Sequence, residues 1–582
     1  APSSRGTGSS TTVEEGEWLR LHPLAREYLR SRAEKTLPEV GRRKIHVRAW
    51  HWLAAHGIPE RAAQHALAAG SQREALRLIS VFLMEEFVQG HHGTVVEWLA
   101  RIPPHIVESD FQLRLTALWT HALGYRLGDT LQQATALIDD RTAHERVRAE
   151  AMAALASAFD MVDRHDEARH YVSLCAALSA GPRARQVLEY LRADFACNAG
   201  QTELGRRLLL PTAGERLSPV VQIWRDFLTT WSYLWEGRPA LAEQVARLQH
   251  SRWEARVGRR DPWSALLASV LAAARWQQDL RSDARALLAD RLDVIERGAG
   301  YGGVIHSYLT LARMAESERD ESRAFRYLEV LATTGETRGM VRLVVTSLAE
   351  RVRLHAARQR PAQAKALLLE LTAVVERSAM SNLLAPQVRL DFEMAKTIAD
   401  VAAGDHASAD THVARAKELA TRLNRGYETV QILALQGLLA ERAGQSPLAP
   451  LTEALSRAEA GGLVRVFADT LPEVVDLVRR RMPDGPTGTV TRAFIDRVLA
   501  ASEATAPSDS RPARLSGNAM LTPKENQVLQ LLAGGLPNKR IAAELELSSE
   551  TVKWHVKKLL AKLNAGNRDH AVDRARMLGL LR

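Results

Sequence analysis

Asp163-Arg164-His165-Asp166-Glu167-Ala168-Arg169 and Pro361-Ala362-Gln363-Ala364 show the pattern that decides the fold: after a polar break, an Ala opens an amphipathic helix. Such breaks recur roughly every 35 to 45 residues, the period of helix-turn-helix solenoids, within an Ala-, Leu- and Arg-rich region between about Asp110 and Arg480. The breaks are Leu127-Gly128-Asp129, Asp163-Arg164-His165, Asn198-Ala199-Gly200, Glu236-Gly237-Arg238, Gln278-Asp279, Glu318-Arg319-Asp320, Gln359-Arg360, Ala403-Gly404-Asp405 and Ala443-Gly444-Gln445. Runs of β-branched residues are few, so we expect helices throughout this region.

Two short helices cannot bury their apolar faces alone, whereas stacked pairs share one continuous core. The sequence therefore predicts an all-α, tetratricopeptide-like solenoid over residues 110–500. The fuller tetratricopeptide consensus is not visible, so an irregular helical domain remains the alternative. A solenoid offers a concave face that suits a peptide, a protein or a small molecule.

Six of the twelve Trp residues lie within two of these repeats: Trp224, Trp231, Trp235, Trp253, Trp263 and Trp276. Such a cluster has two interpretations. Trp224, Trp231, Trp235 and Trp263 would form an aromatic floor for a sugar or ring compound, because an indole offers a wide stacking surface and one polar group. The favoured interpretation is that the indoles fill gaps between helices.

The composition is that of a folded protein of several domains. The chain has 582 residues, of which 46% are hydrophobic and 25% are charged. No apolar run is long enough to span a bilayer, so we expect no membrane contact. With only Cys175 and Cys197 available, a disulfide framework is excluded, and the cytoplasm is the expected compartment. The net charge of +10 permits an acidic partner without naming one.

A polar, Pro-containing linker over residues 501–519 leads into a module of predicted helices. Thr522, Pro523 and Glu525 form a helix start, with Thr522 as the cap. Val528, Leu529 and Leu532 give the first apolar face, and Gly534-Gly535 ends that helix. A second short helix, Asn538 to Leu545, has Ile541, Ala542 and Leu545 inward, and a last helix is expected from Asp569 to Leu578 with Val572, Ala575 and Leu578 available for packing.

The third helix of the module, Ser549 to Leu563, has two contrasting faces. Val552, Val556, Leu559 and Leu563 recur at helical spacing, and the opposite face carries Lys553, Trp554, Lys557 and Lys558, extended by Lys562. Residues 521–582 hold eleven Lys or Arg against six Asp or Glu, so the module carries +5, half of the net charge of the chain. A short helix, a tight turn and a cationic helix is the arrangement that binds the DNA major groove; the weaker alternative is an ordinary solvated helix face.

The motifs of this module resemble the LuxR-type helix-turn-helix family. They are Leu521-Thr522-Pro523-x-Glu525, Gly535-Leu536-x-Asn538-Lys539-x-Ile541-Ala542, Thr551-Val552-Lys553-x-His555 and Lys562-Leu563, followed by Asn567-Arg568. The resemblance implies a four-helix domain over residues 520–582, in which Lys553, Trp554 and Lys557 face base edges. It also implies that Asn538, Lys539, Thr551, His555 and Lys558 contact the DNA backbone. Lys suits guanine O6 and N7, and Trp554 suits a thymine methyl group, while His555 has a structural role as its equal alternative.

The amino-terminal motifs resemble another part of the same family. They are Trp18 to Arg30, then His46-x-x-Ala49-Trp50-x-Trp52-Leu53 and Ala62-x-x-His65-Ala66-Leu67-Ala68-Ala69-Gly70. Their order is similar to the winged-helix tail and first helical segment of MalT-like, ATP-dependent LuxR regulators, which we expect over residues 17–109 after a flexible leader at 1–16. The histidines of this segment suggest a metal site, but His22, His46, His51, His56 and His65 lack a coherent ligand spacing, so no metal is predicted.

In those regulators a nucleotide-binding domain comes first, and it has no counterpart in these residues. No phosphate-binding Gly-x-x-x-x-Gly-Lys-Ser/Thr loop occurs in the 582 residues. We therefore predict no cofactor in this chain, with ATP possible only if an upstream domain exists. No catalytic constellation stands out, so the chain is predicted not to be an enzyme.

Together these features predict a transcriptional regulator whose helical repeats sense a small-molecule inducer or a regulatory protein. Its expected partners are double-stranded promoter DNA, bound as a dimer or higher oligomer, and RNA polymerase. The alternative is an interaction scaffold whose terminal module contacts RNA polymerase or another protein instead of specific DNA.

Overall fold

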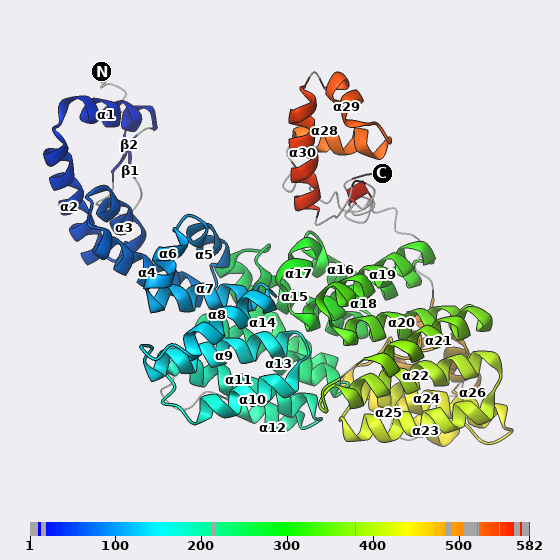
Figure 1. The fold of residues 1–582 in the computed structure, drawn as a ribbon. Coiled ribbons are helices and arrows are strands. Elements are labelled where there is room, and N and C mark those ends of the chain that lie inside the picture. The colour runs from blue at the N-terminus through cyan, green and yellow to red at the C-terminus, as the bar shows by residue number, and fades with distance from the viewer. Residues whose placement is uncertain are drawn as a thin grey trace, which may run out of the picture. The chain divides into compact units, whose positions relative to one another are not determined.

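The computed structural model describes residues 10–12, 19–21, 23–210, 217–378, 380–482, 490–503, 521, 523–545, 547–563, 568, 571–572, 575 and 581. It divides into two compact units, Ala1–Ala117 and Leu118–Arg582. The division falls within helix α7 (Phe111–Leu123), whereas the sequence placed the start of the repeats at residue 110. Figure 1 shows that both units are built almost wholly from helices.

The first unit begins with a short antiparallel pair, β1 (Ser10–Thr12) and β2 (Leu19–Leu21), in which Ser10 lies opposite Leu21. Residues 10–12 therefore form a strand within the segment that the sequence predicts as a flexible leader, residues 1–16, and pairing with β2 supplies the backbone hydrogen bonds of this strand. The helices that follow are α1 (Pro23–Thr36), α2 (Glu39–Ala55), α3 (Pro59–Ala68), α4 (Gln72–Gln89), α5 (His92–Leu99) and α6 (Pro104–Ser109). Their core gathers Ala63, Ile79, Phe82, Leu83, Trp98 and Leu113.

The second unit continues the helical order through the predicted repeat region. Its helices are α8 (Leu127–Ile138), α9 (Glu145–Met161), α10 (His165–Ala176), α11 (Pro182–Asn198), α12 (Thr202–Leu208), α13 (Pro219–Trp235), α14 (Pro239–Val257), α15 (Pro262–Gln277), α16 (Arg281–Leu288), α17 (Leu292–Gly298), α18 (Tyr301–Ser317), α19 (Glu321–Arg338), α20 (Val341–Ala357), α21 (Pro361–Arg377), α22 (Ala385–Ala403), α23 (His406–Arg422), α24 (Gly426–Arg442), α25 (Leu448–Gly461), α26 (Pro472–Arg481) and α27 (Arg492–Ala501). Among the described residues, no helix is long and apolar enough to cross a membrane.

The predicted breaks coincide with the ends of these helices. Every break except the first contains a residue with positive φ: Asp163, Gly200, Gly237, Asp279, Arg319, Gln359, Gly404 and Gly444. A residue with positive φ just after a helix allows the following backbone N–H groups to donate to the last carbonyl groups of the helix, and it reverses the direction of the chain. At the first break the left-handed residue is Tyr125, and Leu127-Gly128-Asp129 instead forms the first turn of α8.

The helices stack as a solenoid. Helix α9 packs on α10 and α11, α11 on α12 and α13, and α13 on α14 and α15, and the same rule continues through α18, α20 and α22. Each pair thereby buries its apolar faces against the next pair, which is the physical basis of a repeat architecture. The predicted all-α, solenoid-like fold is confirmed.

The solenoid also curves until distant repeats meet. Helix α13 contacts α24, and α14 contacts α25. At the junction Gly237, with φ of +70°, lies so close to the backbone of Gly426 that a Cβ atom would clash with it. The Trp276 indole donates to Asp469 at 2.8 Å, and the Gln387 amide donates to the Asn198 carbonyl oxygen at 3.0 Å. These contacts bring side chains separated by about two hundred positions into one interior.

The carboxyl-terminal domain has its own core. Its helices are α28 (Pro523–Ala533), α29 (Asn538–Glu544) and α30 (Ser549–Lys562), and single helical residues follow at 568, 571–572 and 575. The buried residues are Leu521, Val528, Leu529, Leu532, Ile541, Ala542, Val552, Leu559, Leu563, Ala571, Val572 and Ala575. Val556 and Leu545 are partly buried against them. The inward faces predicted from the apolar spacing are confirmed at these positions.

Candidate DNA interface and solenoid cavities

Helix α30 begins at a capped turn. The Ser548 hydroxyl oxygen accepts the Thr551 backbone N–H at 3.0 Å and lies 2.8 Å from the Thr551 hydroxyl. This contact satisfies one of the free N–H groups at the start of the helix. The sequence assigned Ser548 only to a turn and Thr551 to a backbone contact with DNA, so the structure adds a capping role for this pair.

The two faces of α30 differ as the sequence predicted. Val552 and Leu559 are fully buried in the domain core. Lys553, Lys557 and Lys558 are exposed, and the Trp554 side chain is 52% exposed, the largest exposed apolar group of the domain among the described residues. A cationic strip with an accessible indole is thus held rigidly on a packed helix.

The exposed groups of α30 contact one another. The Lys553 ammonium lies 2.7 Å from the Glu550 carboxylate, and the Lys558 ammonium lies 4.2 Å from the centre of the Trp554 ring. Trp554 also meets the His555 ring edge to face at 4.9 Å. His555 is partly buried, and its Nδ1 has no hydrogen-bond partner among the described residues.

The remaining predicted backbone contacts lie at the start of α29. Asn538 is its first residue and is partly buried, and Lys539 is exposed beside Arg540, which the prediction did not include. Lys524 donates to the Leu545 carbonyl oxygen at 3.3 Å, and Arg568 donates to that of Leu536 at 2.6 Å, so both tie the helices together. The predicted cap Thr522, the side chain of Lys562, and Asn567 and Leu578 lie outside the described residues.

The six clustered Trp residues are all buried in the solenoid. Their exposed fractions are 7% for Trp224, 3% for Trp231, 9% for Trp235, 7% for Trp253, 5% for Trp263 and 2% for Trp276. Trp224 meets Trp263 at 5.8 Å between ring centres, and Trp231 meets Trp235 at 4.6 Å. Packing between helices accounts for these contacts. Whether the indoles also bind a ligand depends on the volume of the cavities that they line.

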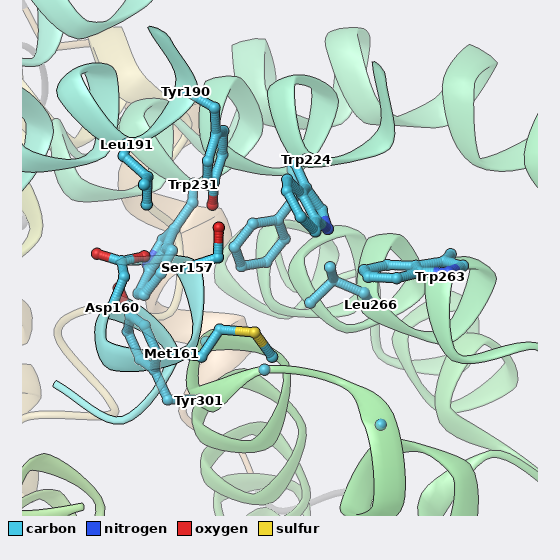
Figure 2. Close-up of a pocket in the computed structure, with 14 residues that line it drawn as sticks. Ser157, Asp160, Met161, Tyr190, Leu191, Trp224, Trp231, Trp263, Leu266 and Tyr301 are labelled. Atoms are coloured by element: carbon cyan, nitrogen blue, oxygen red, sulfur yellow. The ribbon is translucent and has the colours of Figure 1, made fainter. Parts of the chain in front are cut away.

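Trp224, Trp231 and Trp263 line a small cavity of about 60 Å³, together with Tyr190, Asp160 and Tyr301 (Figure 2). Since one water needs roughly 10 to 15 Å³ of such space, this cavity has room for a few waters and not for a metabolite. Trp263 and Trp224 are therefore core residues at the edge of a small void.

A larger cavity of about 210 Å³ lies beside it and shares Trp231. Its walls come from α13, α15, α18, α20, α22 and α24, so it exists only because the solenoid closes on itself. Its polar and aromatic lining includes Trp235, Gln277, His306, Arg313, Arg342, Glu350, Arg353, Gln387, Asp391, Arg425, Tyr427, Glu428 and Gln431. The sequence predicted only the Trp part of this site, since the other residues are scattered over five repeats.

One wall of the large cavity is a buried ion triad. Glu350 accepts from Arg313 at 3.0 Å and from Arg353 at 2.8 Å. Burial alone would raise the pKa of Glu350, but the two guanidinium groups lower it to about 2. Arg313 also donates to the Tyr427 hydroxyl at 2.9 Å. These ion pairs and the hydrogen bond compensate the buried charges and hold the side chains of this wall in place.

Another part of the cavity lining holds charges that are less well compensated. Burial raises the pKa of Asp391 to about 7, helped by the nearby Glu428, and burial also raises the pKa of Glu428. Arg425 lies 4.0 Å from the centre of the Trp235 ring and donates to Gln387 at 2.9 Å, and burial lowers its pKa to about 10. A polar ligand with both donor and acceptor groups would find partners on this wall.

Comparisons with known proteins agree with this architecture. Residues 519–575 match the bacterial regulatory proteins of the luxR family. The HTH-type transcriptional regulator MalT of Vibrio parahaemolyticus is 23% identical over 97% of this chain and 65% of its own length. The nitrate/nitrite response regulator protein NarL of Escherichia coli is 49% identical over 9% of this chain and 24% of its own.

A relative with another name aligns with the helical region as well. The serine/threonine-protein kinase PknK of Mycobacterium tuberculosis is 25% identical over 80% of this chain and 42% of its own length. The chain thus spans less than two thirds of each of these relatives. Residues 519–575 thus match the LuxR family, and over nearly its whole length the chain is similar to MalT.

Proposed function

We propose that this chain is a DNA-binding transcriptional regulator in which α30 enters the major groove of promoter DNA. The observation that carries the proposal is the exposed strip Lys553, Trp554, Lys557 and Lys558 on a capped helix with a buried opposite face. The similarity to MalT, a transcriptional regulator, and to NarL, a response regulator, supports it.

Base contacts are proposed for Lys553, Trp554 and Lys557. A Lys ammonium can donate to guanine O6 and N7, and the half-exposed indole of Trp554 suits a thymine methyl group. Lys553 must leave Glu550 to reach a base. Asn538, Lys539, Thr551, His555 and Lys558 would fix the register through phosphate oxygens, and Arg540 joins this group because it is exposed at the start of α29.

The proposal is tested by selecting binding sites from random duplex DNA with the full chain, followed by anisotropy titrations on the selected site. Specific binding that falls steeply with salt is expected, because cationic side chains displace condensed counterions. The matched control for strip variants is Lys365→Ala, an exposed lysine of solenoid helix α21. Failure to enrich any sequence, with RNA polymerase or another protein retained instead, would favour the interaction scaffold.

We further propose that the large cavity senses an inducer. Its volume of about 210 Å³, its indole walls at Trp231 and Trp235 and its incompletely compensated groups Asp391, Arg425 and Glu428 support a small polar ligand. Such a ligand would quench or shift Trp fluorescence. Trp235→Phe should reduce that response, whereas Trp253→Phe, a buried indole that does not line this cavity, should not. A response that stays complete in both variants would remove the cavity from the proposal.

Assembly on DNA as a dimer or higher oligomer and contact with RNA polymerase complete the proposed function. The first follows from the idea of a regulator that binds repeated half-sites, and the second follows from its proposed role in transcription. Light scattering of the chain with and without its selected DNA measures the first, and retention of polymerase on that DNA measures the second.

A further inference from the structure

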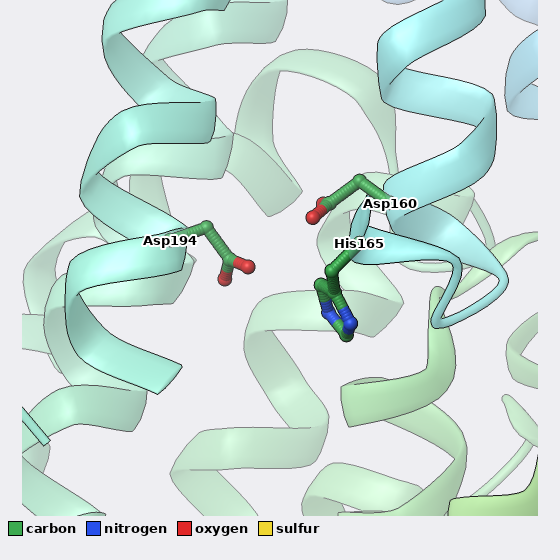
Figure 3. Close-up of side chains that lie close together, drawn as sticks. All are labelled: Asp160, His165 and Asp194. Carbon is green, nitrogen blue, oxygen red and sulfur yellow. The ribbon is translucent and has the colours of Figure 1, made fainter. Parts of the chain in front are cut away.

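Three ligand-type side chains from successive helices converge in the solenoid interior. Asp160 lies in the last turn of α9, His165 is the first residue of α10, and Asp194 lies on α11. Figure 3 shows the two carboxylates pointing toward each other with the imidazole close by. One ligand atom from each residue lies within 4.8 Å of the others.

The three side chains of this cluster are buried, and two of their ligand atoms lack a hydrogen-bond partner among the described residues. Asp160, His165 and Asp194 are 4%, 0% and 2% exposed. Asp160 Oδ1 and His165 Nε2 are buried atoms without a hydrogen-bond partner among the described residues. Buried polar atoms normally have a partner, so two orphaned ligand atoms of different chemical types at one place require a cause.

The surrounding contacts orient the ligands. The Ser381 hydroxyl oxygen lies 3.1 Å from His165 Nδ1 and also accepts the Leu384 backbone N–H at 3.2 Å. An Nδ1–H that donates to Ser381 leaves a lone pair on Nε2. Asn198 donates to Asp194 Oδ2 at 2.7 Å. Partners of this kind fix the tautomer and direction of metal ligands in known sites.

The charges at the cluster do not balance. Asp163 pairs with the Arg342 guanidinium at 3.0 Å, and this one guanidinium also acts on Asp160 and Asp194, where it lowers the pKa of each carboxyl group. Burial and the neighbouring carboxylates raise the pKa of Asp160 well above its usual range, and burial raises that of Asp194 to about 7. Burial also lowers the pKa of His165 to about 3, so its imidazole is neutral. A single cation placed among these three side chains would lie next to two carboxyl groups and one neutral imidazole.

We propose that Asp160, His165 and Asp194 bind one divalent transition-metal ion. One imidazole nitrogen and two carboxylate oxygens suit Zn²⁺, Mn²⁺ or Co²⁺, whereas the hard ions Ca²⁺ and Mg²⁺ prefer oxygen ligands alone. The ion would join α9, α10 and α11 across two repeats. The site does not depend on DNA binding. The sequence did not indicate it, since only the histidines of the amino-terminal segment had suggested a metal.

The test begins with the full chain, stripped with a chelator and titrated with ZnCl₂ or CoCl₂ by calorimetry at neutral pH. We expect one ion per chain, with proton release visible as a dependence of the heat on the buffer. Co²⁺ should give visible absorption bands, and the melting temperature should rise with metal. Absence of stoichiometric binding of Zn²⁺, Mn²⁺ and Co²⁺ at millimolar concentration would overturn the proposal and leave a shared proton as the whole explanation.

Variants distinguish this site from adventitious binding. Asp194→Asn keeps the shape and removes a charge, and we expect its affinity to fall by about 100-fold or more, beyond the roughly 10- to 100-fold typical of outer-shell changes. Asp226→Asn, at a buried carboxylate outside the cluster, is the matched control and should bind as the parent does. If Asp194→Asn does not fold, His165→Gln provides the same comparison. Unchanged affinity in either folded cluster variant would contradict the proposal.

Discussion

The recognition helix and the solenoid interior both concentrate charged side chains, but in opposite surroundings. On α30, Lys553, Lys557 and Lys558 face solvent, and their strongest contact is one exposed ion pair. In the solenoid, Glu350, Arg353 and Asp391 line a cavity, and Glu350 and Arg353 pair with Arg313 and Glu316 of the neighbouring helix α18. Solvent screens the first set and leaves it available for DNA, whereas burial makes each charge of the second set depend on its neighbours.

The largest expected effect comes from breaking the buried triad. Glu350→Gln leaves Arg313 and Arg353 without their shared carboxylate, and we expect a loss of about 3 to 5 kcal/mol in unfolding free energy. Urea unfolding measures it. Glu453→Gln, which removes the exposed partner of Arg457, is the control and should cost less than about 1 kcal/mol. Similar losses of unfolding free energy in both variants would contradict the contrast between buried and exposed charges.

The triad also predicts a pH dependence. The pKa of Glu350 is lowered from 4.5 to about 2, so its contribution to stability is present above pH 4.5 and is lost as the pH falls through about 2. Acid unfolding of the parent should show this loss, and Glu350→Gln should not.

Asp391, elsewhere in the cavity lining, predicts a pH dependence of stability that is opposite in sign to that of Glu350. Its pKa is raised from 3.8 to about 7, so the folded chain holds a proton that the unfolded chain releases, and stability falls as the pH rises between these values. Asp391→Asn should therefore stabilise the chain above neutral pH, by up to about 4 kcal/mol, and have little effect near pH 4. Melting temperatures across this range measure it, with exposed Asp410→Asn as control. An equal effect at both ends would contradict the assignment.

An intermediate effect is expected at the DNA surface. Lys557→Ala should weaken specific DNA binding by about 1 to 3 kcal/mol if Lys557 contacts a base, and it should leave the melting temperature nearly unchanged because the side chain is exposed. Lys558→Ala should instead weaken binding to all sequences alike and reduce the salt dependence. An unchanged footprint and affinity in Lys557→Ala would remove its base contact.

The smallest effect is expected from the exposed pair on α30. Glu550→Gln releases Lys553 and should change stability by less than about 0.5 kcal/mol. DNA affinity should rise slightly, because Lys553 no longer has a competing carboxylate. Anisotropy titrations at low and high salt measure the change, and weaker binding would indicate that Glu550 itself contacts a base.

Some elements were predictable from the sequence and others were not, and the difference has physical reasons. Helix breaks were predictable because a left-handed residue such as Asp163, Gly237 or Gln359 ends a helix by local geometry. The inward faces of the terminal domain followed from apolar spacing. The strand at Ser10–Thr12 was missed since its stability depends on pairing with Leu19–Leu21 and not on its own residues.

By itself the sequence determined the helical repeats, the two faces of α30 and the concentration of positive charge in the last module, because each depends on residues close together in the chain. Only the tertiary structure decided which buried groups meet. The cavity beside Trp235 and the cluster of Asp160, His165 and Asp194 arise from packing between repeats. Burial then makes the ionisation of each group depend on side chains far away in sequence, which no local pattern records.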